Sequence, residues 1–286
     1  MRRCLILPSH RQGVRLLADI VPLSSVQFLG QSLIEYWLSH LANSGTKEVI
    51  VLVESPGSRA RRVISDGARW GLKAEVFEEP SELRPEQALS KFTGAGSLDE
   101  ARAGMTVVDH FPEDARHPLF TSYADCFAAL LNWMPRAKMP DRVGLREVQP
   151  GVWVNLPCHV SRRARLKPPC WVGKHVFAGA DAVIGPDAVV EEGAFIEAQA
   201  EVSHSWVGPD TLVGRGTQLA NSIAIGSRLI NYQTESLAVV PDPFVLCSLR
   251  RSTARVRDAE ETVLLPTAPE EPNHWLWKAL LLHKER

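Results

Sequence analysis

A hydrophobic residue recurs at every sixth position through the second half of the chain. The register holds over Val154, Val160, Leu166, Val172, Ala178, Ile184, Val190, Ile196 and Val202. After a slip of one residue it continues through Val207, Val213, Leu219 and Ile225. A period of six predicts a hexapeptide parallel β-helix, in which three hexapeptides make one turn and the aliphatic residues point inward. Each turn buries its apolar residues only against its neighbours, so stacking supplies the stability.

Small residues and glycines accompany this period. Small or β-branched residues stand four positions after the aliphatic ones, at Val176, Ala182, Ala188, Ala194 and Ala200. Glycine directly follows the aliphatic residue at Gly173, Gly179, Gly185, Gly208, Gly214 and Gly226. We expect these residues to permit the tight corners of the coil. A β-sandwich with frequent turns is the alternative, but a sandwich does not hold a six-residue period.

The first half of the chain alternates between strand and helix patterns. Residues 4–7 are a short apolar strand, and residues 48–53 are a β-branched run of the kind that is buried on both faces of a parallel sheet. Apolar positions 33–41 recur at helical spacing, and Gly45 suits the left-handed position that ends a helix. This order predicts right-handed crossovers and an open parallel sheet.

The same alternation continues with weaker signals. A second helix is expected from Ala60 to Ala68, ending near Gly71, followed by a strand at 72–77. A further strand is expected at 105–108 and a helix at 123–134.

Composition narrows the function classes. The 286 residues are 45% hydrophobic and 23% charged, as in an ordinary globular protein. A net charge of -1 argues against a protein whose main task is to grip nucleic acid. No apolar run is long enough for a membrane-spanning helix, and the N-terminal run is too short for a signal peptide, so we expect a cytoplasmic protein. The five cysteines are scattered without a CxxC motif, which favours buried thiols over disulfides or a zinc site.

Three short motifs add to this architecture. They are Gly13-Val14-Arg15-Leu16 after the first strand, Gly30-Gln31-Ser32-Leu33-Ile34-Glu35-Tyr36 at the start of the first long helix, and Asn221-Ser222-Ile223 in the repeat. With the order of the two folds, they resemble the nucleotide-sugar pyrophosphorylase family. Its members join a nucleoside triphosphate to a sugar 1-phosphate and release pyrophosphate. The resemblance covers about residues 1–55 and 150–230. It implies a reduced Rossmann-like nucleotidyltransferase domain followed by a left-handed parallel β-helix.

The residues that would carry the chemistry depart from the family pattern. Phosphoryl transfer needs backbone donors, cations and carboxylates that hold magnesium. The glycine-rich opening loop is here Pro8-Ser9-His10-Arg11-Gln12, and Leu23 and Gln31 replace two lysines. The base-recognition segment near 79–89 has no glycine, and residues 1–148 are shorter than the family's catalytic domain. These departures favour a degenerate member over an active one.

Several residues remain candidates if catalysis is retained. The resemblance implies that Gly13 and Arg15 contact the nucleotide and that Asp109, at the end of a strand, holds Mg²⁺, the only cofactor expected. Hexapeptide acyltransferases use a histidine of the β-helix as general base, which makes His159, His175 and His204 the candidates for that alternative. Those enzymes usually interrupt the repeat with a loop, whereas this repeat runs unbroken from Val154 to Val202.

The sequence thus predicts three regions: an α/β domain at 1–148, a β-helix at 149–232, and an irregular tail at 233–286 whose apolar segment 275–282 forms a short helix. We expect a degenerate nucleotidyltransferase-like protein of cell-surface polysaccharide metabolism, which binds a nucleotide or nucleotide-sugar or regulates an active partner. It would form homo-oligomers, or bind a partner protein, through the β-helix. An assembly scaffold without nucleotide binding and an acyltransferase are the alternatives. The base, the sugar and the oligomer size are left open.

Overall fold

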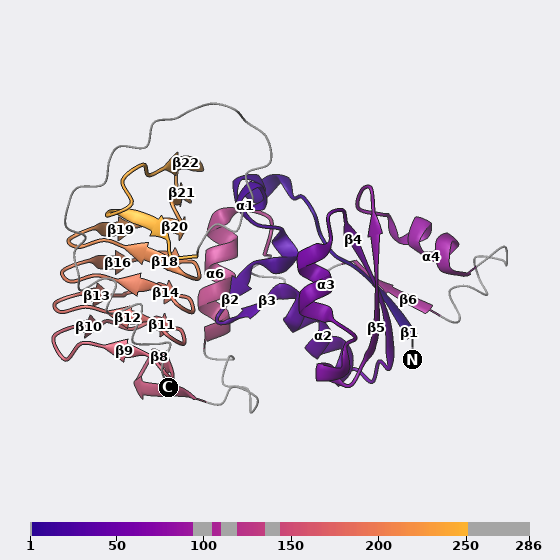
Figure 1. Ribbon diagram of the computed structural model, residues 1–286, viewed down its shortest axis with the longest axis horizontal. Coiled ribbons are helices and arrows are strands. Elements are labelled where there is room, and N and C mark those ends of the chain that lie inside the picture. Colours follow the sequence, from indigo (N-terminus) through magenta and orange to yellow (C-terminus); the bar gives the residue numbers. More distant parts are fainter. Residues whose placement is uncertain (1, 94–104, 110–118, 135–143, 251–286) are drawn as a thin grey trace, which may run out of the picture. The chain divides into compact units, whose positions relative to one another are not determined.

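A four-stranded parallel sheet forms the first part of the chain. Its order is β5-β4-β1-β6, with pairing in register throughout. The strands are β1 (Arg2–Ile6), β4 (Glu48–Glu54), β5 (Lys73–Glu79) and β6 (Met105–Val108). The computed structural model describes residues 2–93, 105–109, 119–134 and 144–250 (Figure 1). The short helix predicted at 275–282 lies outside the described residues. The predicted α/β arrangement is confirmed.

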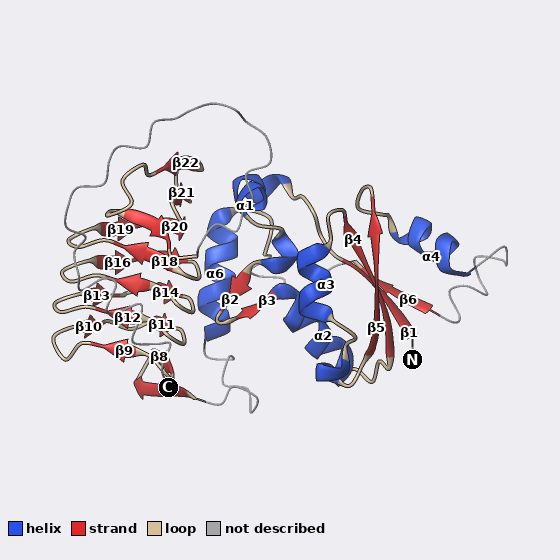
Figure 2. Ribbon diagram, viewed as in Figure 1, coloured by secondary structure: helices blue, strands red, loops and turns tan. Residues whose placement is uncertain are grey.

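Helices cover this sheet (Figure 2). The α-helices are α1 (Arg15–Ile20), α2 (Leu33–Asn43), α3 (Ser58–Ile64), α4 (Pro85–Thr93) and α6 (Tyr123–Trp133). Short 3₁₀ helices are η1 (Gln12–Val14), η2 (Leu23–Ser25) and η3 (Ala68–Trp70). Alternate side chains of β1 and β4 point to opposite faces, as the pleat requires: Leu5 packs with the core that includes α2, and Cys4 packs with the cluster that includes α4. Among the described residues no helix is long and apolar enough to cross a membrane.

Helix α2 forms as its sequence predicts, and α3 is shorter than predicted. Ser32 and Glu35 make a reciprocal capping box at the start of α2, and Gly45 takes a left-handed φ of 78° after its end. The second helix was expected to continue to Ala68. It ends at Ile64 instead, because Ser65 adopts a left-handed φ of 51°. Ala68 starts the separate helix η3.

The second half is a coil of many short strands that pass in turn through three sheets. In sequence order they are β7 (Leu145–Gln149), β8 (Val152–Asn155), β9 (His159–Val160), β10 (Arg165–Leu166), β11 (Cys170–Val172), β12 (Phe177–Ala178), β13 (Val183–Ile184), β14 (Ala188–Val190), β15 (Phe195–Ile196), β16 (Glu201–Ser203), β17 (Ser205–Val207), β18 (Thr211–Val213), β19 (Gln218–Ala220), β20 (Ser222–Ile225), β21 (Arg228–Asn231), β22 (Ser236–Val239) and β23 (Leu246–Ser248).

The pairing of these strands follows the predicted repeat. The eight-stranded sheet has the order β22-β21-β20-β17-β14-β11-β8-β7, the five-stranded sheet β23-β18-β15-β12-β9, and the third sheet β10-β13-β16-β19. Each strand from β8 to β17 pairs in parallel with the strand one turn further along the chain, as Trp153 does with Trp171. The handedness of the coil stays a prediction.

The inward positions match the six-residue period except at its end. Val172, Ile184, Val190 and their equivalents are buried in one apolar cluster, together with the small residues predicted at the corners. In the last turn the inward residue is Ala224, which pairs with Val207. Ile225, which the period predicted to point inward, instead packs against the core that the coil shares with the α/β part. The prediction for Ile225 is wrong by one position because the register slips again.

The glycines after the aliphatic residues serve two purposes. Gly185 and Gly226 take positive φ, as expected for tight corners. A Cβ on Gly173 would lie 2.7 Å from the Glu192 nitrogen of the next turn, so glycine there permits the close stacking of successive turns. Other left-handed corners are occupied by residues such as His175, Asp181 and Asp210, with φ between 48° and 61°. Asn, Asp and His tolerate this conformation better than most side chains.

One outward row of the coil is apolar and buried. Side chains on the eight-stranded sheet form a ladder, Trp153, Trp171, Val189, Trp206 and Ile223, in which each residue pairs with the next. All five are at most 6% exposed, and they share one hydrophobic core with the α/β part. The ring of Phe28 stacks on Trp206 with centroids 5.2 Å apart. The tryptophan ladder therefore joins the two folds.

A buried carboxylate fixes the same junction. The hairpin of β2 (Gln27–Phe28) and β3 (Gln31–Ser32) turns at Leu29 and Gly30, both at positive φ. Their backbone N–H groups donate to the two carboxylate oxygens of Glu191, at 2.6 and 2.7 Å. Glu191 is fully buried in the coil. Leu29 holds a conformation that non-glycine residues rarely adopt, and these bonds keep it in place.

We predict that Glu191→Ala lowers the free energy of unfolding by about 3 kcal/mol, because it removes the carboxylate that accepts from one buried and one partly buried N–H group. Urea denaturation followed by circular dichroism measures the loss. Glu192→Ala changes the neighbouring, partly exposed residue and should stay within about 0.5 kcal/mol of the parent protein. Equal stability of the two variants would show that the carboxylate does not hold the junction.

Candidate functional site

A cavity opens at the carboxyl ends of β1 and β4. Its volume is about 190 Å³. Ser9 and His10 follow β1, and Glu54 and Ser55 end or follow β4. Helix η2 supplies Ser24 and Ser25 on the other side. The carboxyl ends of parallel strands are where open α/β sheets bind ligands. We refer to this space as the first cavity.

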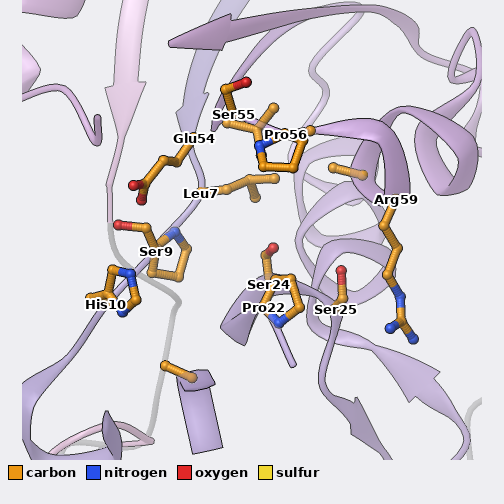
Figure 3. A pocket seen from close by; sticks show the side chains of 15 residues that line it. Leu7, Ser9, His10, Pro22, Ser24, Ser25, Glu54, Ser55, Pro56 and Arg59 are labelled. Atoms are coloured by element: carbon orange, nitrogen blue, oxygen red, sulfur yellow. The ribbon is translucent and has the colours of Figure 1, made fainter. Parts of the chain in front are cut away.

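Hydroxyl groups make up most of the polar lining of the first cavity. Figure 3 shows the hydroxyls of Ser24 and Ser25 pointing into the space and the guanidinium of Arg59 extending away from the Glu54 carboxylate. Leu23, which stands where the resembling family has a lysine, is fully buried and does not line the cavity. The cavity thus offers hydrogen bonds from several sides but few positive charges.

The loop after β1 is held by a carboxylate of the protein itself. Glu82 accepts hydrogen bonds from the Ser9 backbone N–H at 3.0 Å and the Ser9 hydroxyl at 3.1 Å. Arg11 donates to both Glu82 oxygens in a bidentate pair, each bond 2.8 Å long. A phosphate oxygen bound to this loop would use the same donors. Glu82 therefore occupies the place that an anionic ligand would take.

The charge state of Glu82 follows from these contacts. Burial alone would raise the pKa of the Glu82 carboxyl, but the hydrogen bonds from Arg11 and Ser9 outweigh it and lower the pKa below its ordinary value. The pKa of Arg11 is raised, first by its hydrogen bonds to Glu82. Both groups are therefore charged at neutral pH, and the loop has its negative charge supplied from within the chain.

The structure places the predicted nucleotide-binding residues outside the first cavity. Arg15 is exposed at the start of α1 and does not line the cavity. The missing Cβ of Gly13 faces the backbone of Thr121, whose oxygen would lie 1.9 Å from it. Gly13 is thus required for close packing of two backbone segments. The nucleotide contacts predicted for Arg15 and Gly13 stay predictions.

Asp109 follows β6 and is exposed. Its charged neighbour is Arg11, whose pKa it helps to raise. Among the described residues, no group of three or more His, Cys, Asp or Glu side chains is placed to hold a metal ion.

The three candidate histidines of the coil lie apart. His159 is on β9, where its ring stacks on Phe177 with centroids 5.1 Å apart. His175 and His204 are exposed corner residues with left-handed φ. The Nδ1 atom of His204 lies 3.0 Å from an Asp187 carboxylate oxygen, the arrangement that orients a general base. None of the three histidines lines the first cavity, and none lines the second cavity, which lies where the α/β part meets the coil. The acyltransfer role stays a prediction, and His204 has the partner it would need.

Sequence reasoning missed Glu82, Glu54 and the serines of η2. Glu82 lies in the segment where the family has a base-recognition loop, and nothing in its local sequence indicates a contact with residues 9 and 11. Ser24 and Ser25 directly follow Leu23, which stands where the resembling family has a lysine. Two polar residues next to that position are a signal that could have been used.

Comparisons of the sequence with protein-family models and with curated proteins found no match. The function is therefore inferred from the residues and geometry of the site.

We predict that Glu82→Gln lowers the free energy of unfolding by about 1–2 kcal/mol at pH 7, because it removes the charge that holds Ser9 and Arg11. The folded pKa of Glu82 is lowered, so its contribution is complete above the unfolded pKa and is lost as the pH falls through the folded pKa. The difference between parent and variant, measured by urea denaturation, should therefore shrink as the pH falls from 7 to about 3.

Glu86→Gln is the matched control, since Glu86 is an exposed residue of the first turn of α4. It should change stability by less than about 0.5 kcal/mol at either pH. A loss in Glu82→Gln that is the same at pH 3 and pH 7 would contradict the charge-based tether.

Proposed function

We propose that this chain is a nucleotidyltransferase-like protein with a left-handed β-helix that binds a nucleotide or nucleotide-sugar in the first cavity without transferring a nucleotidyl group. The supporting observation is the position of the first cavity at the carboxyl ends of β1 and β4, the usual ligand position of an open parallel sheet. A cytoplasmic role in cell-surface polysaccharide metabolism belongs to this proposal, as does regulation of an active partner.

The size and lining of the first cavity indicate which part of the ligand enters it. A volume of about 190 Å³ is below the usual range for whole drug-sized ligands. Hydroxyls of Ser9, Ser24, Ser25 and Ser55 and the Glu54 carboxylate can accept and donate hydrogen bonds. These groups suit a base or a sugar ring better than a triphosphate, whose charge the Glu54 carboxylate would repel.

The contacts of the loop after β1 are the reason to propose that no nucleotidyl group is transferred. Stabilising a transferring phosphate requires donors and cations that point at it. Here the Ser9 N–H and Arg11 are engaged with Glu82, and buried Leu23 replaces the lysine. Magnesium enters the proposal only if catalysis is retained, with Asp109 as the ligand. We therefore place the function in binding.

We predict that calorimetry with a panel of nucleotides and nucleotide-sugars, with magnesium present, finds saturable binding of at least one. Ser55→Trp should weaken that binding by about tenfold or more, because the indole fills the mouth of the first cavity. Ser90→Trp, at an exposed position of α4, is the control and should leave affinity within about twofold.

No binding up to about 1 mM, or an equal loss of affinity in both variants, would contradict the assignment of a nucleotide to the first cavity. Pyrophosphate release from a nucleoside triphosphate and a sugar 1-phosphate would show that catalysis is retained and would overturn the second half of the proposal.

A second candidate function, an assembly scaffold, is favoured by an aromatic row on the five-stranded sheet. His159, Phe177 and Phe195 stack along the coil, with centroids of the two phenylalanines 4.2 Å apart. Unlike the tryptophan ladder, this row is only partly buried or exposed. A partly exposed aromatic row on a flat sheet suits an interface with a second copy of the chain or with a partner protein.

If this face carries self-association, Phe195→Glu should lower the oligomeric state measured by sedimentation velocity at about 10 µM protein, because it places a charge in the row. Glu201→Gln, on the third sheet, is the control and should not change the sedimentation coefficient. A parent protein that sediments as a monomer would remove self-association from this candidate.

A further inference from the structure

A larger cavity lies where the α/β part meets the coil. Its volume is about 320 Å³. The α/β part contributes residues of α1, the β2 strand and Arg59 of α3. The coil contributes Trp206, Ile225, Arg228 and Arg250. Arg59 and Ser25 also line the first cavity, so the two spaces are neighbours. We refer to the larger space as the junction cavity.

The junction cavity is positively charged. Three arginines line it, Arg59, Arg228 and Arg250, and none of its described lining residues is acidic. Arg250 is ion-paired with Asp210, and Arg228 donates to the backbone oxygen of Asp19 at 3.2 Å. Each guanidinium has five N–H donors, so donors remain on both. Three cations and one nearby carboxylate leave an excess of positive charge in a protein whose net charge is -1.

Arg59 is the arginine whose charge is least compensated. It is half-buried, and no carboxylate or carbonyl oxygen of the described residues pairs with its guanidinium. Burial lowers the pKa of Arg59, and the charges of Arg250 and Arg62 lower it further. Holding like charges together in a partly buried place costs free energy, and a bound anion would remove that cost.

The rest of the lining combines apolar side chains with serines, and two of its residues carry an unsatisfied polar atom. Val26, Trp206 and Ile225 line the cavity. The buried amide oxygen of Gln27 and the buried indole nitrogen of Trp206 have no hydrogen-bond partner among the described residues. Buried polar atoms without partners are uncommon in native proteins, and each of them calls for an explanation. A ligand here would combine an anion with an apolar body that carries hydrogen-bonding groups.

We propose that the junction cavity is a binding site for a small phosphomonoester with an aromatic or apolar body. Its phosphate would lie among Arg59, Arg228 and Arg250, whose forked donors match phosphate oxygens. A phosphate carries a charge of about -1.5 to -2, which matches the local excess. Its body would lie against Trp206 and Ile225. This site adjoins the first cavity and shares Arg59 with it, but Arg228 and Arg250 line only the junction cavity, and the proposal holds whether or not the first cavity binds a nucleotide.

The test is calorimetry with phenyl phosphate, inorganic phosphate, AMP and glucose 1-phosphate. Phenyl phosphate should bind saturably and more tightly than inorganic phosphate, because its ring buries apolar surface. Arg59→Gln and Arg228→Gln should each weaken the binding by about tenfold or more. Arg62→Gln is the matched control: Arg62 lies on the same helix and is exposed, and it does not line the cavity. It should leave affinity within about twofold. Tighter binding of AMP would support the site and identify the body as an aromatic base, whereas tighter binding of glucose 1-phosphate would overturn the aromatic or apolar body.

Arg228 is exposed, so its substitution should leave the fold intact, which circular dichroism and the thermal midpoint verify. Absence of binding of all four probes at about 1 mM would overturn the proposal. Equal weakening in Arg62→Gln and Arg228→Gln would overturn it as well, since it would indicate only a general charge effect. Loss of phenyl phosphate binding in Ser55→Trp but not in Arg228→Gln would place the ligand in the first cavity, and the junction site would be wrong.

Discussion

The burial of one face of the coil against the α/β part is the interaction on which the rest of the structure depends. A parallel coil satisfies its inward residues by stacking, but its outward faces must meet either water or another surface. Trp153, Trp171 and Trp206 make one face too apolar for water, and the α/β part covers it. A single hydrophobic core therefore crosses residue 148, where the sequence suggests a boundary. The α/β part is a four-stranded sheet with short helices, and it buries apolar surface against the coil. A larger domain would bury that surface within itself.

The contact between the coil and the α/β part also creates both candidate sites. Glu191 fixes the β2–β3 hairpin, and that hairpin follows directly on η2, whose serines line the first cavity. Gln27 of the hairpin and Trp206 of the ladder line the junction cavity. The position of both cavities therefore depends on how the coil meets the hairpin. A protein that needs only a rigid platform would not require three arginines at that seam.

The sequence was sufficient for most of the fold because the strongest signals are local and periodic. The six-residue period identified the inward residues, and the helical spacing of apolar positions 33–41 with Gly45 at their end identified α2. The tryptophan ladder was not predicted, although the sequence places Trp153, Trp171 and Trp206 directly before inward valines. A period reveals which residues point inward, but it does not say which outward face another part of the chain covers. The contacts of Glu82 and Glu191 join residues that are 71 and 162 positions apart, and no local pattern records such pairs.

The charge distribution differs between the loop after β1 and the junction cavity. In the loop after β1 the positive charge of Arg11 is neutralised by Glu82, so an incoming phosphate would have to displace a bidentate carboxylate. At the junction cavity the relation is reversed, because no carboxylate of the residues that the structure describes pairs with Arg59, and Arg250 and Arg62 crowd it. One cationic group is thus neutralised from within the described chain, and another is not. An anion bound at this seam, as we propose, would stabilise the contact between the two folds.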